Sequence, residues 1–109
     1  MLFRSLAQDA ATILMDEPTT YLDVVHQLRL MDMAKQLAAQ GKAIVMVLHD
    51  LSQALRTADE VVVLSDGQIA AKGTPDHVFE SGKLQEVFGI GIERVWTKSG
   101  WHYFHFSEI

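Results

Sequence analysis

The sequence contains no cysteine and only two prolines among its 109 residues, and basic residues do not cluster anywhere along it. Without cysteine, neither a disulfide framework nor a thiolate metal site can form. The longest apolar runs, such as residues 43–48, are far shorter than the roughly 18 residues expected of a membrane span. Arg4 and Asp9 interrupt the N-terminal stretch, which therefore lacks the layout of a secretory signal. These absences favour a soluble protein of the cytoplasm.

The charge balance argues against nucleic acid as a partner. Nine Lys and Arg residues stand against 14 Asp and Glu residues, which gives a formal net charge of -5. A nucleic-acid surface requires a basic stripe, and none is present. Because 49% of the residues are hydrophobic, the chain has enough apolar material for one core. We therefore expect residues 1–109 to form a single α/β domain.

One stretch, Ile13 to Pro18, combines an apolar run with two adjacent carboxylates. The apolar run predicts a buried strand, and the run stops at Asp16 and Glu17. Pro18 disfavours helical geometry in the residue before it, so we expect Glu17 to be extended at the strand end. Both acids would then lie at the edge where open parallel sheets bind ligands.

A helix and a second strand follow this stretch. Residues 22–40 carry apolar side chains at helical spacing and end at Gly41, which is the preferred residue just beyond a helix. Residues 43–48 form a second apolar run that is rich in β-branched side chains. Strand, helix and strand in this order predict a βαβ unit with parallel strands. His49 would then emerge at the same sheet edge as the two carboxylates.

The rest of the chain predicts short elements around this unit. Asp50 is placed to cap a helix, with Gln53 returning the hydrogen bond as in a capping box. Met1 to Gln8 consists mostly of good helix formers and predicts the tail of a helix. The other expected elements are a strand over 61–65, a turn at Asp66-Gly67 into a strand over 68–72, short helices over 75–79 and 84–88, and a terminal β-hairpin over 92–97 and 101–106.

The two carboxylates and the histidine suit phosphoryl transfer. Asp16 can position Mg²⁺ through its water shell, because this hard cation prefers oxygen ligands and loses water reluctantly. Glu17 can orient or deprotonate an attacking water, and His49 can contact the terminal phosphate. Taken alone, an Asp-Glu pair is more often the solvated start of a loop. A receiver-like phospho-acceptor using Asp16 is a further alternative, but no lysine ends a later strand to pair with a phosphoryl group.

Three stretches together resemble motifs of one family, the nucleotide-binding subunits of ATP-binding cassette (ABC) transporters. Ile13 to Pro18 resembles the Walker B motif, Thr20 to Asp23 the D-loop, and Val47 to Asp50 the switch-histidine region. Within this family, the sequence is most similar to importers of ferric siderophores, haem or cobalamin. The residues that carry this similarity are Asp-Glu-Pro-Thr-Thr-Tyr-Leu-Asp, His26-Gln27 and Leu48-His49-Asp50-Leu51. The resemblance implies a partial P-loop NTPase-type parallel sheet with flanking helices, a βαβ core and a C-terminal hairpin.

The resemblance also implies roles for individual residues. Asp16 would serve Mg²⁺, Glu17 would be the catalytic carboxylate and His49 would contact the γ-phosphate of ATP. Asp23 would reach the nucleotide site across a dimer interface. The implied partners are a transmembrane permease and a second nucleotide-binding subunit, on the cytoplasmic face of the cell membrane.

Several parts of the family pattern do not occur in this sequence. There is no Gly-x-x-x-x-Gly-Lys-Ser/Thr loop (Walker A) to hold phosphates, no glutamine loop and no Leu-Ser-Gly-Gly-Gln signature. We therefore expect a part of such a subunit that begins after the signature and that alone has no appreciable ATPase activity and little affinity for ATP. An uncovered strand edge would favour self-association. The alternative function is a non-catalytic interaction or self-association module.

Overall fold

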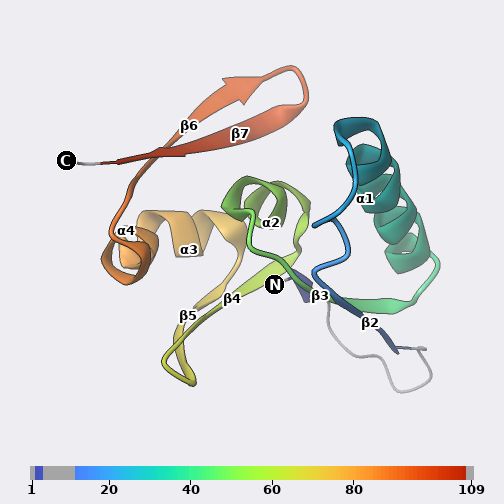
Figure 1. The fold of residues 1–109 in the computed structure, drawn as a ribbon, viewed down its shortest axis with the longest axis horizontal. Coiled ribbons are helices and arrows are strands. Elements are labelled where there is room, and N and C mark those ends of the chain that lie inside the picture. Colours follow the sequence, from blue (N-terminus) through green and yellow to red (C-terminus); the bar gives the residue numbers. More distant parts are fainter. Residues whose placement is uncertain (1, 4–11, 108–109) are drawn as a thin grey trace.

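A five-stranded sheet and a separate two-stranded hairpin carry the fold (Figure 1). The computed structural model describes residues 2–3 and 12–107. The strand order of the large sheet is β2-β3-β1-β4-β5, and β6 pairs with β7. The strands are β1 (Leu2–Phe3), β2 (Thr12–Asp16), β3 (Ala43–Val47), β4 (Glu60–Ser65), β5 (Gln68–Gly73), β6 (Gly91–Thr97) and β7 (Gly100–Phe106). The helices are α1 (Val24–Ala39), α2 (Leu51–Thr57), α3 (Pro75–Glu80) and α4 (Lys83–Phe88).

The predicted βαβ unit is confirmed. Strands β2 and β3 pair in parallel from Thr12 opposite Ala43 to Asp16 opposite Val47, and α1 connects them. Helix α1 ends where expected, because Gly41 takes a φ of +93°, a left-handed conformation that suits glycine. The carboxyl ends of the two strands therefore meet at one end of the sheet.

The expectation that residues 13–16 form a buried strand is wrong. Strand β2 is the outermost strand in the described sheet, and its side chains alternate between exposed and half-buried. Leu14 is 70% exposed. An edge strand has a neighbour on one side only, so its apolar sequence does not ensure burial.

The predicted N-terminal helix is also wrong where the structure tests it. Leu2–Phe3 forms the strand β1, which lies between β3 and β4 and runs antiparallel to both. Leu2 pairs with Met46 of β3 and with Val61 of β4, so its backbone occupies an inner position of the sheet. Tertiary pairing therefore overrides local helix propensity. The rest of that predicted helix lies outside the described residues.

Two apolar clusters form the core. The first joins α1 to β3, and the second joins β4 to α2, α3, α4 and the hairpin. The first contains Met31, Ala34, Ile44 and Met46. The second contains Leu55, Val61, Val63, Val78, Leu84, Ile92 and Tyr103. Ala58, just after α2, packs against both clusters and connects them.

The hairpins are confirmed. Strands β4 and β5 turn at Asp66 and Gly67, both with positive φ, as an Asp-Gly hairpin turn requires. Strands β6 and β7 form the predicted terminal hairpin, which packs beside α2 and lies above α2, α3 and α4 in Figure 1. Among the described residues, no helix is both long enough and apolar enough to cross a membrane.

Candidate functional site at the ends of strands β2 and β3

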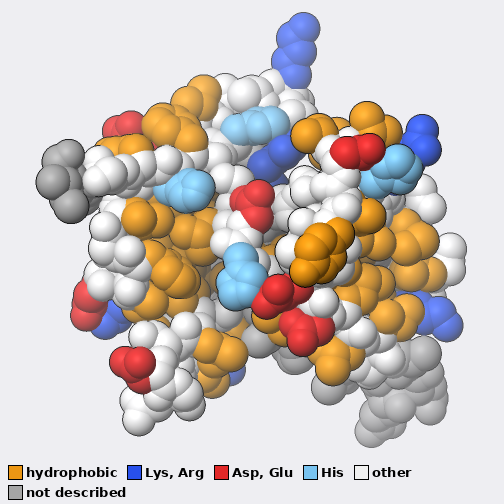
Figure 2. All heavy atoms as spheres, in the orientation of Figure 1, with side chains coloured by type: hydrophobic (Ala, Val, Ile, Leu, Met, Phe, Trp, Pro, Cys, Tyr) orange, Lys and Arg blue, Asp and Glu red, His pale blue; other side chains and the backbone are white. Residues whose placement is uncertain are grey.

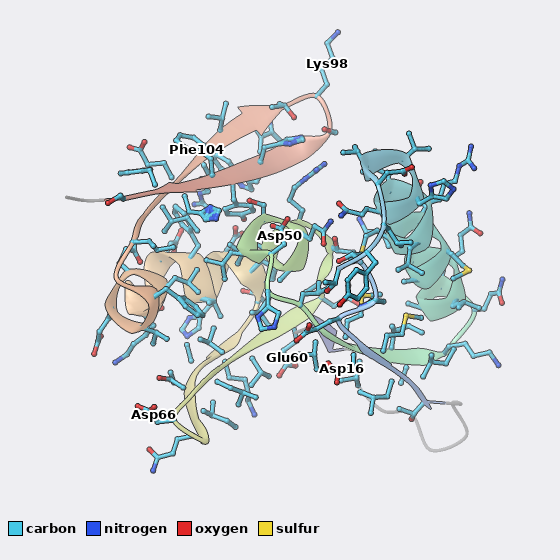
Figure 3. All side chains as sticks on the ribbon, in the orientation of Figure 1. Asp16, Asp50, Glu60, Asp66, Lys98 and Phe104 are labelled. Atoms are coloured by element: carbon cyan, nitrogen blue, oxygen red, sulfur yellow. The ribbon has the colours of Figure 1, made fainter. Side chains whose placement is uncertain are left out.

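A carboxylate and an imidazole meet where the two parallel strands end. Glu17 directly follows β2, and His49 lies two residues beyond the end of β3. His49 Nε2 and Glu17 Oε1 are 2.5 Å apart. The expectation that His49 emerges beside Glu17 is thereby confirmed. Figure 3 labels the residues that adjoin this pair in sequence, Asp16 at the end of β2 and Asp50 just before α2.

The backbone of Glu17 departs from the expectation. Its φ is +49°, which lies in the left-handed region and not in the extended region that Pro18 was expected to impose. Its N–H donates to the carbonyl oxygen of Val47 at 2.8 Å, while its carboxylate contacts His49. These two contacts offset the cost of a conformation that non-glycine residues rarely adopt, and such residues cluster at functional sites.

Asp16 presents an exposed carboxylate beside Glu17. Within the described ranges, no group of three or more His, Asp or Glu side chains is placed to hold a metal ion. A single carboxylate nevertheless suits Mg²⁺, which usually keeps several waters and takes few protein ligands. The donor chemistry at Asp16 therefore fits a hydrated magnesium ion.

Asp23 is engaged at the start of α1. Its Oδ1 accepts a hydrogen bond from the backbone N–H of His26 at 2.9 Å and lies 2.7 Å from His26 Nδ1. The backbone bond and then the imidazole contact lower the pKa of the Asp23 carboxyl below its usual range. In this structure Asp23 caps its own helix, and its contacts with His26 do not bring it to Glu17 or His49.

A set of polar side chains that sequence reasoning missed lies next to the pair. The buried Thr19 donates its hydroxyl to Gln53 Oε1 at 3.2 Å, and Gln53 Nε2 donates to Gln27 Oε1 at 3.0 Å. Gln27 Nε2 donates to the carbonyl oxygens of Thr19 and Leu22 at 3.2 and 3.0 Å. The three residues are distant in sequence, so no local pattern predicts their contact.

The predicted capping box at α2 is therefore half correct. Asp50 caps the helix, because its carboxylate accepts from the N–H of Gln53 at 3.2 Å. The side chain of Gln53, however, bonds to Thr19 and Gln27 instead of returning to the backbone of Asp50. Hydrogen bonds to residues distant in sequence thus replace the local bond that a capping box would form.

Two cavities adjoin the site. The first, of about 160 Å³, is polar and is lined by Glu17, Thr19, Thr20, Gln27, Leu48, His49, Asp50 and Gln53. The second, of about 250 Å³, is mostly apolar and is lined by the end of β3, by residues 61–64 of β4 and by side chains of α2 and α4. Figure 2 shows acidic and histidine side chains side by side near the centre of this face.

Comparison with known proteins identifies the relationship. No profile of a known protein family matches the chain. The hemin import ATP-binding protein of Thermobifida fusca (strain YX) is 50% identical over 95 residues, which are 87% of this chain and 34% of that protein. The petrobactin import ATP-binding protein of Bacillus anthracis is 42% identical over 90 residues, or 82% of this chain and 33% of that protein. The chain is a relative of ABC-transporter ATP-binding subunits.

The relationship extends to the fold. A solved structure described as a metal-chelate type ABC transporter in an inward-facing conformation superposes with a TM-score of 0.73 at 22% identity, covering 89% of this chain and 40% of that chain. The resemblance drawn from the motifs and the partial NTPase fold are thus confirmed. The chain spans about a third of the length of the curated ABC relatives it matches.

Proposed function

We propose that this chain supplies the catalytic carboxylate and the switch histidine of an ATP-hydrolysing subunit in an importer of hemin or siderophore type. The contact between Glu17 and His49 at the ends of two parallel strands carries the proposal. The identity to hemin and petrobactin import ATP-binding proteins supports the class of importer. The ABC family uses ATP and Mg²⁺ in its intact subunits.

The geometry suggests how the residues divide the work. Glu17 contacts His49 through Oε1. Its second oxygen, Oε2, would hold the attacking water and accept its proton, while the His49 imidazole would orient Glu17 and contact the terminal phosphate. Asp16 would hold Mg²⁺ through water, and the ion would supply positive charge to the phosphates. Asp23 would reach the nucleotide site of a second subunit across a dimer interface, once its carboxylate no longer contacts His26.

The remaining nucleotide contacts would come from the other two-thirds of the length of the relatives. The sequence has no Walker A loop, and the position between β3 and β4 in the described sheet is taken by β1. A strand of the intact subunit that took the place of β1 between β3 and β4 would bring a phosphate-binding loop to the end of the sheet where Glu17 lies. This chain alone therefore has little affinity for ATP. Titration calorimetry that measured micromolar binding of Mg-ATP to it would contradict this statement.

A chimera tests the function directly. Residues 12–106 of this chain would replace the matching segment of the Thermobifida fusca hemin import ATP-binding protein. We expect the chimera to hydrolyse ATP within about tenfold of its parent, a loss of up to about 1.4 kcal/mol in transition-state stabilisation. A folded chimera that binds ATP but does not hydrolyse it would contradict the proposal.

The assembly follows the family. ABC-importer ATP-binding subunits work as dimers with a transmembrane permease, and they are cytoplasmic and membrane-associated. We extend these partners and this location to the protein that contains this chain.

Self-association of the chain itself is a second candidate function, favoured by its exposed apolar surface. Leu14, Val24 and Leu28 are 70%, 70% and 56% exposed on β2 and α1. An apolar edge strand pairs readily with another chain.

A further inference from the structure

Two separate routes connect His49 to Glu17. The direct route is the 2.5 Å contact between His49 Nε2 and Glu17 Oε1. The indirect route begins at Asp50, next to His49, whose carboxylate holds the backbone N–H of Gln53. It continues through the Gln53 side chain to Thr19, two residues beyond Glu17. The contacts therefore close a ring that contains both members of the pair.

The amide of Gln53 in this ring and the amide of Gln27, which bonds to it, have only one consistent orientation. Gln53 accepts from Thr19 through Oε1 and donates to Gln27 through Nε2. Gln27 accepts from Gln53 and donates to two backbone carbonyls, those of Thr19 and Leu22. Turning either amide over would place donor against donor or acceptor against acceptor. The donors and acceptors of Thr19, Gln27 and Gln53 therefore form one fixed arrangement.

Burial makes the arrangement hard to break. Thr19 is 8% exposed, and both glutamines are half-buried. The buried Thr19 hydroxyl is costly to leave without its partner, because burial limits the access of water to it. The same carbonyl of Thr19 also accepts from the N–H of Leu22 at 3.1 Å, which closes the turn that leads to Asp23. Gln27 therefore holds this turn at both of its ends.

These three polar side chains lie next to the pair of Glu17 and His49. Thr19, Gln27 and Gln53 line the same polar cavity of about 160 Å³ as Glu17 and His49. Since a water occupies about 30 Å³ of liquid, the cavity has room for a few waters or one small polar group.

We propose that Thr19, Gln27 and Gln53 are positioning residues that hold Glu17 against His49 and fix the turn from Thr19 to Leu22. The functional meaning of the arrangement rests on the proposed function of Glu17 and His49. The positioning itself is a property of this chain and is measurable without nucleotide.

The test is NMR spectroscopy of the isotope-labelled chain. Its readouts are the imidazole resonances of His49 and the backbone order parameters of residues 19–22. The Glu17→Gln variant serves as a reference, because it shows where the His49 resonances lie when the carboxylate partner is absent. We expect Thr19→Val and Gln27→Leu to move the His49 resonances toward the Glu17→Gln position. The order parameters of the turn should fall from about 0.85 to below about 0.6.

Two matched variants serve as controls. Thr19→Ser keeps the hydroxyl, and Gln36→Leu makes the same exchange as Gln27→Leu at an exposed position of α1. Both should leave the His49 resonances and the turn as in the unmodified chain. Circular dichroism confirms that each variant is folded. If Thr19→Val unfolds, Gln27→Leu decides the question, because it lies on a half-buried helix position.

His49 resonances and turn order parameters that stay unchanged in folded Gln27→Leu would overturn the proposal. So would changes of equal size in Gln36→Leu. Neither result depends on ATP hydrolysis, so failure of the positioning proposal leaves the chimera experiment intact. Conversely, an inactive chimera would leave the NMR result standing.

Discussion

At the scale of single residues, Glu17 connects the two strands of the site in two ways. Its N–H bonds to Val47 at the end of β3, and its carboxylate contacts His49 beyond that strand. The positive φ of Glu17 lets one residue satisfy both contacts, because it turns the backbone sharply at the end of β2. The position of this carboxylate is thus set by backbone pairing as well as by its side chain.

Asp23 predicts a pH dependence at the same scale. Its pKa is lowered in the folded state, first by the backbone N–H of His26 and then by the His26 side chain. A carboxyl with a lowered folded pKa stabilises the fold fully above its unfolded pKa and loses this effect as the pH falls through the folded pKa. Asp23→Asn, which keeps a capping oxygen without charge, should flatten the decline in stability between about pH 5 and about pH 3.

Urea unfolding of both proteins across this pH range is the measurement. The free energy of unfolding of the unmodified chain should fall more steeply with decreasing pH than that of Asp23→Asn. Parallel curves would show that the charge of Asp23 adds nothing to the cap.

At the scale of elements, Arg94 fastens the terminal hairpin to α3. Its guanidinium lies 4.4 Å from the ring centre of Phe79 and 4.1 Å from that of Trp101. It also pairs with Asp76 at 2.8 Å and Glu80 at 3.3 Å, and its side chain is only 16% exposed. A planar cation between two rings with carboxylates at its edge is a geometry that lysine does not reproduce.

Arg94→Lys should therefore destabilise the chain although it keeps the charge. We expect a loss of about 1 to 2 kcal/mol in the free energy of unfolding, the size of a desolvated cation–π contact. Lys98→Met, at the exposed tip of the same hairpin, is the control and should change stability by less than about 0.5 kcal/mol. An Arg94→Lys variant as stable as the unmodified chain would show that the ring contacts contribute little.

Elements that rest on local pattern were predictable from the sequence. Continuous apolar runs located β2 and β3, the helical spacing of apolar residues located α1, and the Asp66-Gly67 turn located the hairpin of β4 and β5. The pairing of Glu17 with His49 followed from the parallel geometry of the strands. Features set by distant partners were not predictable. The strand at Leu2–Phe3 and the contacts of Gln53 with Thr19 and Gln27 depend on residues far away in sequence.

At the scale of the whole molecule, the two apolar clusters meet at Ala58 and support our proposal that residues 1–109 form one domain. The exposed surface of β2 and the start of α1 contrasts with this shared core. Leu14 is 70% exposed on the outermost described strand. We expect the chain to cover this surface by forming a dimer or larger species.

Leu14→Lys should weaken this association, because a lysine on an edge strand discourages pairing with another chain. Light scattering as a function of concentration should detect a dimer or larger species for the unmodified chain and a shift toward the monomer for Leu14→Lys. Val95→Lys, on the outer face of the hairpin, is the matched control and should associate like the unmodified chain. A clean monomer of the unmodified chain at high concentration would contradict the expectation.

The central claim, that Glu17 acts on the attacking water beside His49, is tested most directly by the ATP hydrolysis rate of the chimera carrying Glu17→Gln. We predict that the rate falls by about 10² to 10⁴, the usual contribution of a general base, while ATP binding is retained. Glu93→Gln, on the exposed face of the hairpin, should leave the rate unchanged. A Glu17→Gln chimera that hydrolyses ATP as fast as the Glu93→Gln chimera would contradict the account.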